Sequence, residues 1–187
     1  GSRRIRSLAD FRGTPPADWI LPVTRLADAL AAVHDAGVVH RDVKAANVLV
    51  DGAGRIGLVD FGVAAALGTD AARALAGGGS PAAMSPQQHA GEAPAPADDV
   101  YAFGALLHEL ATGRPAVPVS AGTADGRDLP ALAAATRVPD RLRQLVARCL
   151  AAAPDARPAD MRDVHGLLER LIADEFDATQ PPPALAA

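Results

Sequence analysis

Polar side chains that could handle a phosphate group are concentrated between residues 40 and 60. Asn47 precedes one apolar run and Asp60 follows another, and amide and carboxylate oxygens are ligands that Mg²⁺ accepts together with phosphate oxygens. Asp42 lies shortly before Asn47 and could orient a nucleophile, while Lys44 offers a positive charge to the group being transferred. These residue types in this order indicate the transfer of a phosphoryl group.

The segment between the two candidate metal ligands is expected to fold back as a β-hairpin. Val48–Val50 and Ile56–Val59 are apolar runs, and Asp51–Gly54 between them has the composition of a turn. Neighbouring strands lie about 4.8 Å apart, so a hairpin places the two metal ligands side by side. Residues 52–57 also match G-x-G-x-x-G, but a strand rather than a helix follows them, so we interpret them as part of the hairpin.

Five short motifs, in this order, resemble those of eukaryotic-type serine/threonine protein kinases. They are His40-Arg41-Asp42 with Asn47, Asp60-Phe61-Gly62, Ser85-Pro86-Gln87 in the place of Ala-Pro-Glu, Asp99 to Gly104, and Asp155-Ala156-Arg157-Pro158. They cover residues 7 to 173, and Lys44 resembles the serine/threonine class rather than the tyrosine class. The resemblance implies transfer of the γ-phosphate of ATP to a Ser or Thr hydroxyl of a protein substrate, with ATP and Mg²⁺ as cofactors.

The resemblance also implies a role for each matching position in the reaction. Asp42 would orient and deprotonate the substrate hydroxyl, and Lys44 would contact the γ-phosphate. Asn47 and Asp60 would hold Mg²⁺, and Leu49 would lie under the adenine ring.

Other matching positions are expected to act through structure. His40 would pack against Phe61, with Gly62 completing that triplet. Asp99 would bind the backbone of the catalytic loop, although an ordinary helix N-cap is the alternative interpretation.

A third group of positions is expected to regulate or support the site. Arg41 could bind a phosphate on Thr69, whose alternative role is that of a plain loop residue. Ser80 would place its hydroxyl beside the catalytic residues. Arg157 would contact Gln87, where the family has a glutamate, and this neutral hydrogen bond would be weaker than a charge pair.

The fold class expected is mainly α (α+β), a helical bundle like the large, C-terminal lobe of a kinase around a buried central helix at about 99–112. A small β-hairpin would carry the catalytic and metal-binding residues, and amphipathic periodicity predicts further helices over 19–36 and 161–173.

The expected divisions are residues 1–2 as a cloning remnant, 3–176 as the lobe with catalytic loop 40–47 and activation segment 60–87, and 177–187 as an acidic, proline-rich disordered tail. Thr179 in that tail could be a phosphorylation site or part of a plain linker.

Composition narrows the classes of protein that the chain could represent. With 187 residues it has the length of one domain, and its net charge of -4 argues against nucleic acid as a partner. No apolar run reaches the ~20 residues that a membrane span needs. Cys149 is the single cysteine, so we expect a reducing, cytoplasmic compartment and an inert core residue.

Lys44 is the only lysine in the sequence, although a complete kinase uses a second one, in its small lobe, to hold the ATP phosphates. We therefore expect the small lobe to be absent and the isolated chain to have little activity. A partner could supply that lobe, or the apolar surface that normally faces the small lobe could drive self-association. The alternative is a kinase-like, non-catalytic scaffold; a small-molecule phosphotransferase is disfavoured by the motifs at residues 85–87 and 155–158.

Overall fold

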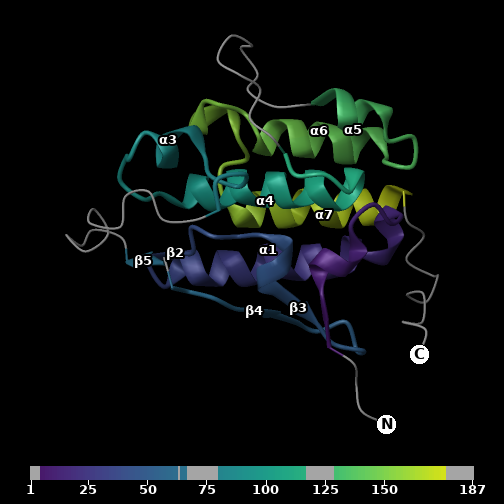
Figure 1. Cartoon of the computed structure of the whole chain (residues 1–187), viewed down its shortest axis with the longest axis horizontal. Coiled ribbons are helices and arrows are strands. Elements are labelled where there is room, and N and C mark those ends of the chain that lie inside the picture. The colour runs from purple at the N-terminus through teal and green to yellow at the C-terminus, as the bar shows by residue number, and fades with distance from the viewer. Residues whose placement is uncertain (1–4, 63, 67–79, 117–128, 176–187) are drawn as a thin grey trace.

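The computed structural model describes residues 5–62, 64–66, 80–116 and 129–175 of the chain. Helices dominate these residues, which agrees with the mainly α class expected (Figure 1). None of the helices in the described ranges has both the length and the apolar character needed to cross a membrane. The elements are β1 (Arg6–Ser7), α1 (Ile20–Asp35), β2 (Val38–Val39), β3 (Val48–Val50), β4 (Ile56–Leu58), β5 (Ala65–Ala66), α3 (Pro86–His89), α4 (Pro96–Thr112), α5 (Leu129–Ala134), α6 (Asp140–Cys149) and α7 (Met161–Glu175), with short 3₁₀ turns at Leu8–Phe11, Pro16–Asp18, Ala45–Asn47 and Pro154–Ala156.

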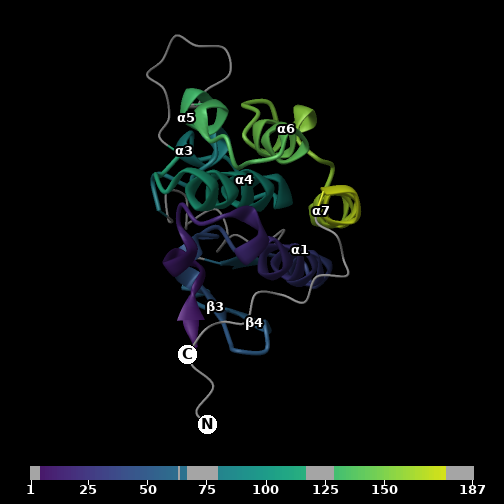
Figure 2. The ribbon, with the colours of Figure 1, turned by 90° about the vertical axis from the view of Figure 1, so that its right-hand side faces the viewer.

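Helix α4 is the buried central helix that the sequence predicts. Its residues from Asp98 to His108 are all buried, and Figure 2 shows α5 and α6 on one side of it and α1 on the other. The helix begins three residues earlier than expected, because Pro96 suits the first turn and the Asp98 carboxylate accepts the N–H of Ala95 at 3.0 Å. It ends where predicted, before Gly113, whose φ of 72° is left-handed.

The remaining helices complete the core around α4. Helix α1 buries its apolar stripe, including Val23, Leu26 and Leu30, and Figures 1 and 2 show that it lies beside α7. Helix α6 follows Pro139, which occupies its N-cap position, and α7 extends two residues beyond the predicted range. Cys149 at the end of α6 is fully buried, and burial raises the pKa of its thiol to about 12, so it is an unreactive core residue.

The predicted hairpin forms from β3 and β4, which are antiparallel with Val48 opposite Leu58. The Asp51 carboxylate accepts backbone N–H groups within the turn, so the G-x-G-x-x-G match is a hairpin turn. Strand β1 pairs with the other edge of β3, and β2 pairs with β5 in a second small sheet. These two pairings are long-range, and no local sequence pattern predicted them.

Candidate active site

The segment from β2 to β3 carries the candidate catalytic residues and is anchored to α4 by a buried carboxylate. The two oxygens of Asp99 accept the backbone N–H groups of His40 and Arg41, each at 2.8 Å. Arg41 has a left-handed φ of 69°, which is costly for a residue with a side chain, and these charge-assisted bonds hold it there. The N-cap position of α4 is Ala95, so the interpretation of Asp99 as an ordinary N-cap is wrong.

His34, near the end of α1, also contacts Asp99, and the sequence analysis did not single it out. Its Nε2 atom lies 2.8 Å from the same Asp99 oxygen that accepts the N–H of His40. One carboxylate therefore joins α1, α4 and the catalytic loop. A histidine within an amphipathic helix gives no local signal of this contact, because its partner is distant in the sequence.

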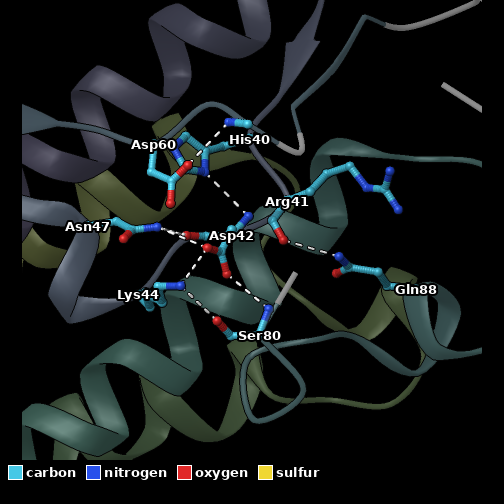
Figure 3. Close-up of polar contacts among 9 residues, drawn as sticks. His40, Arg41, Asp42, Lys44, Asn47, Asp60, Ser80 and Gln88 are labelled. Atoms are coloured by element: carbon cyan, nitrogen blue, oxygen red, sulfur yellow. Dashed lines mark hydrogen bonds and ion pairs between the residues drawn. The ribbon is translucent and has the colours of Figure 1, made fainter. Parts of the chain in front are cut away.

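The carboxylate of Asp42 lies at the centre of the cluster shown in Figure 3. Its Oδ2 atom accepts hydrogen bonds from Lys44 Nζ at 2.6 Å and Asn47 Nδ2 at 3.0 Å, and Oδ1 accepts the backbone N–H of Ser80 at 2.9 Å. Lys44 Nζ also donates to Ser80 Oγ at 2.9 Å. The structure thus brings four of the predicted site residues together, and their roles in a reaction stay predictions.

The surroundings of Asp42 act on its pKa in opposite directions. Burial alone would raise the pKa, because a less polar environment disfavours the charged form. Hydrogen bonds from Lys44, Ser80 and Asn47, together with the charge of Lys44, outweigh burial and hold the pKa below its ordinary value of 3.8. Asp42 is therefore a carboxylate at neutral pH and can accept a hydrogen bond from a hydroxyl group.

Asn47 and Asp60 stand at the joined ends of the hairpin. The N–H of Val59 donates to the carbonyl of Asn47 at 2.9 Å, which places Asp60 next to Asn47. The side-chain nitrogen of Asn47 is directed at Asp42, so its oxygen lies on the other side of the amide. In Figure 3 the exposed Asp60 carboxylate lies above the contact between Asn47 and Asp42, and its Oδ1 atom accepts the N–H of Gly62 at 3.4 Å.

These two oxygen-bearing groups fit a magnesium ion, which takes oxygen ligands and usually keeps several waters. Asp60 has a φ of 65°, and such a left-handed conformation of a non-glycine residue is often found at functional sites. In the described part of the chain, no cluster of three or more His, Cys, Asp or Glu side chains could hold a metal ion. The binding of Mg²⁺ by Asn47 and Asp60 stays a prediction.

His40 and Phe61 make the contact that the resemblance implies. Their rings lie 4.5 Å apart, edge to face, and His40 is fully buried. Phe61 itself is 45% exposed, so of this pair only His40 is enclosed within the molecule. Gly62 leaves little room for a side chain, because a Cβ atom there would lie only 3.1 Å from the Asp60 carboxylate.

Leu49 lies on β3 and is half-buried. Side chains alternate along a strand, and its neighbours Val48 and Val50 face the core, so Leu49 faces the opposite side of the sheet. The position of Leu49 under the adenine ring stays a prediction.

Arg41 is only 2% exposed, and two nitrogens of its guanidinium group have no hydrogen-bond partner among the described residues. Its carbonyl accepts the side-chain amide of Gln88 at 3.1 Å, a contact from α3 that sequence reasoning missed. Buried cations without partners are costly, so an anion is expected to fit beside Arg41. Thr69 lies outside the described residues, and its phosphorylation stays a prediction.

Gln87 and Arg157 lie in direct contact. Arg157 Nη2 donates to Gln87 Oε1 at 2.6 Å, and the guanidinium also donates to three backbone carbonyls at 2.8–3.0 Å. The amide nitrogen of Gln87 donates to the carbonyl of Ala152 at 3.0 Å, a bond that a glutamate could not make. The replacement of glutamate by glutamine therefore keeps this anchor, with neutral hydrogen bonds in the place of a charge pair.

Comparison with known proteins places this geometry in a family. Residues 14–169 match the protein kinase domain. The chain is 40% identical over 169 residues to the serine/threonine-protein kinase PkaA of Streptomyces coelicolor, a match that covers 86% of this chain and 30% of that protein. PkaB of the same organism is 37% identical (91% of this chain, 46% of that protein), and PknL of Mycobacterium tuberculosis is 36% identical (95% and 47%). The chain thus spans less than half the length of each of these relatives.

Proposed function

The chain belongs to the protein kinase family, and we propose that it is the catalytic lobe of a serine/threonine kinase that transfers the γ-phosphate of ATP to a protein hydroxyl. The observation that carries this proposal is the Asp42 carboxylate, ionised and held by Lys44, Asn47 and Ser80. An acceptor for a hydroxyl proton and a cation for phosphate oxygens are thereby fixed within one hydrogen bond of each other.

Each side chain has a defined part in the proposed transfer. Asp42 accepts the hydrogen bond of the substrate hydroxyl, orients its oxygen and takes its proton as the new O–P bond forms and the bond to ADP breaks. Lys44, 2.6 Å from that carboxylate, places its charge beside the oxygens of the moving phosphoryl group. Ser80 binds both residues and keeps them in register.

Asn47 and Asp60 would hold Mg²⁺, and Leu49 would offer apolar surface to the adenine ring. The ion, when bound, neutralises the charge of the ATP phosphates. Asn47 also ties this region to the catalytic carboxylate, because its amide donates to both the backbone and the side chain of Asp42.

The large lobe of the kinase fold is proposed to span residues 3–176, with the catalytic loop at 40–47 and the activation segment at 60–87. Lys44 is the only lysine of the sequence and already pairs with Asp42, so it cannot also serve as the lysine that holds the ATP phosphates from the small lobe. The chain by itself is therefore proposed to bind ATP weakly and to need a small lobe, from outside these 187 residues or from a partner.

Thr69 is proposed as the regulatory phosphorylation site of the activation segment. The support is the buried guanidinium of Arg41, which has two nitrogens without partners in the described part of the chain. A phosphate group would supply the oxygens that those nitrogens need.

The test of this function is the transfer of radiolabel from [γ-³²P]ATP to a Ser/Thr protein substrate by the full-length protein that contains this segment. Asp42→Asn removes the proton acceptor with little change in shape, and we expect the rate to fall by about 10²–10⁴-fold. Asp28→Asn, which changes an exposed carboxylate on α1, is the matched control and should keep the activity. Wild-type transfer that survives Asp42→Asn would refute the proposal.

A non-catalytic scaffold is the second candidate, and the exposure of apolar side chains beside the site favours it. Val59 and Phe61, on either side of Asp60, are 39% and 45% exposed. A scaffold would use such a surface to hold a partner. If calorimetry detects no binding of Mg-ATP to the full-length protein and no label is transferred, the scaffold is the correct function.

A further inference from the structure

A cavity of about 280 Å³ lies between α6 and α7, and it shares no lining residue with the candidate active site. The two helices are in contact and stand next to each other in Figure 2. Three leucines and three arginines line most of this α6–α7 cavity: Leu145, Leu167, Leu171, Arg141, Arg148 and Arg170. A cavity of about 150 Å³ can hold a benzene molecule, so the α6–α7 cavity has room for an aromatic side chain.

The positive charge of these arginines is only partly balanced. Arg141 pairs with Asp174 of α7, and Arg148 lies 4.0 Å from Asp163, a distance at which an ion pair is weak. Arg170 makes no ion pair within the described ranges. The whole sequence has 22 acidic residues against 18 lysines and arginines, so three arginines around one cavity are a local exception. The cavity therefore fits a group that joins negative charge to an apolar side chain.

The sequence places a segment of this chemistry directly after α7. From Asp174 to the end of the chain there are three carboxylates, one aromatic side chain, and neither lysine nor arginine. The aromatic residue is Phe176, and Asp177 follows it; both lie outside the described residues. Arg141 holds Asp174 at the wall of the cavity. A chain advances by at most about 3.6 Å per residue, so the backbone of Phe176 must lie within about 7 Å of that of Asp174.

We propose that this segment folds back onto its own domain, with the ring of Phe176 in the α6–α7 cavity and the Asp177 carboxylate paired with Arg170. The ring would leave water for a wall that contains leucines, and a bond between guanidinium and carboxylate is charge-assisted. The contact would join the end of α7 to α6 and set the direction in which residues 178–187 leave the domain. It is independent of the proposed catalysis.

The experiment measures cleavage of the 187-residue chain by chymotrypsin after Phe176, with the fragment 177–187 followed by mass spectrometry. A synthetic peptide of residues 174–187, which has no cavity to enter, gives the rate for the free segment. Cleavage requires the undocked form, so we expect the bond to be cut about tenfold or more slowly in the chain than in the peptide.

Variants of the proposed pair test its charges, and each is compared with a peptide of matching sequence. Arg170→Glu and Asp177→Arg each place like charges together, and each should bring the cleavage rate of the chain to within about threefold of its peptide. The double variant Arg170→Glu/Asp177→Arg restores opposite charges and should recover most of the protection. Arg162→Ala, which removes an exposed arginine of α7 that pairs with Asp35, is the control and should keep the wild-type rate.

A wild-type chain that is cut as fast as the peptide would overturn the proposal. Greater protection in Asp177→Arg would overturn it too, because a helix that continues past Glu175 is stabilised by a cation near its C-terminus, whereas the docked segment is not. Protection that rises with protein concentration would put the segment on a second copy rather than on its own domain. Protection that is independent of concentration, lost in both single variants and recovered in the double variant would support the fold-back.

Discussion

Asp42 and Asp99 carry the same carboxylate group but have different hydrogen-bond partners, and these partners give them different roles. Asp42 accepts hydrogen bonds from a lysine and an amide, and its side chain is 8% exposed. Asp99 has no exposed surface, and its oxygens bind two backbone N–H groups and His34. In the proposed function the first acts in the reaction, and the second holds the backbone that carries the first.

Asp99→Asn tests this division at the scale of a single residue. An asparagine has one acceptor oxygen, so its amide nitrogen would face a backbone N–H of His40 or Arg41, and one buried donor would lose its partner. We expect a loss of about 1–3 kcal/mol in the free energy of unfolding, measured by urea denaturation.

The exposed Asp28→Asn substitution provides the reference and should change the free energy of unfolding by less than about 0.5 kcal/mol. Equal stability of the two variants would show that the Asp99 carboxylate does not anchor the loop.

At the scale of the elements, the sequence predicted what local patterns can encode. Periodic apolar residues located α1, α4 and α7 to within three residues, and the glycine turn located the β3–β4 hairpin. The pairing of β1 with β3 and the contacts of His34 and Gln88 escaped prediction. Each of these depends on a partner far along the chain, which neither periodicity nor turn composition reports.

The packing of α4 against α6 depends on a glycine. A Cβ atom at Gly104 would lie 2.5 Å from the Cβ atom of Cys149 and 3.2 Å from the Leu150 side chain. Both of those residues are buried, so the helices would have to separate to admit a methyl group.

Gly104→Ala is therefore expected to destabilise the protein by about 1–3 kcal/mol despite the better helix propensity of alanine. Thermal and urea unfolding measure the change. Gly57→Ala on β4 is the control, since a Cβ atom there would meet nothing within 4 Å, and its effect should be smaller. A Gly104→Ala variant as stable as the wild type would mean that α4 and α6 are not packed this closely.

At the scale of the whole molecule, the hairpin side of the site exposes apolar surface that the helical core does not cover. Val59 and Phe61 flank Asp60, and both are more than a third exposed. In the proposed kinase this surface is covered by the small lobe. When the 187-residue chain is studied alone, burial of the same surface between copies would lower its free energy, because apolar area removed from water is stabilising.

We therefore expect the isolated chain to associate at high concentration, as measured by size-exclusion chromatography with light scattering. The double variant Val59→Ser/Phe61→Ser should shift the population toward the monomer, because it removes the apolar area beside Asp60. Leu21→Ser on α1 changes a side chain as exposed as Val59 (39% for each) and should leave the association unchanged. A wild-type chain that stays monomeric throughout would indicate that this surface needs no cover, and would weaken the case for a small lobe seated on it.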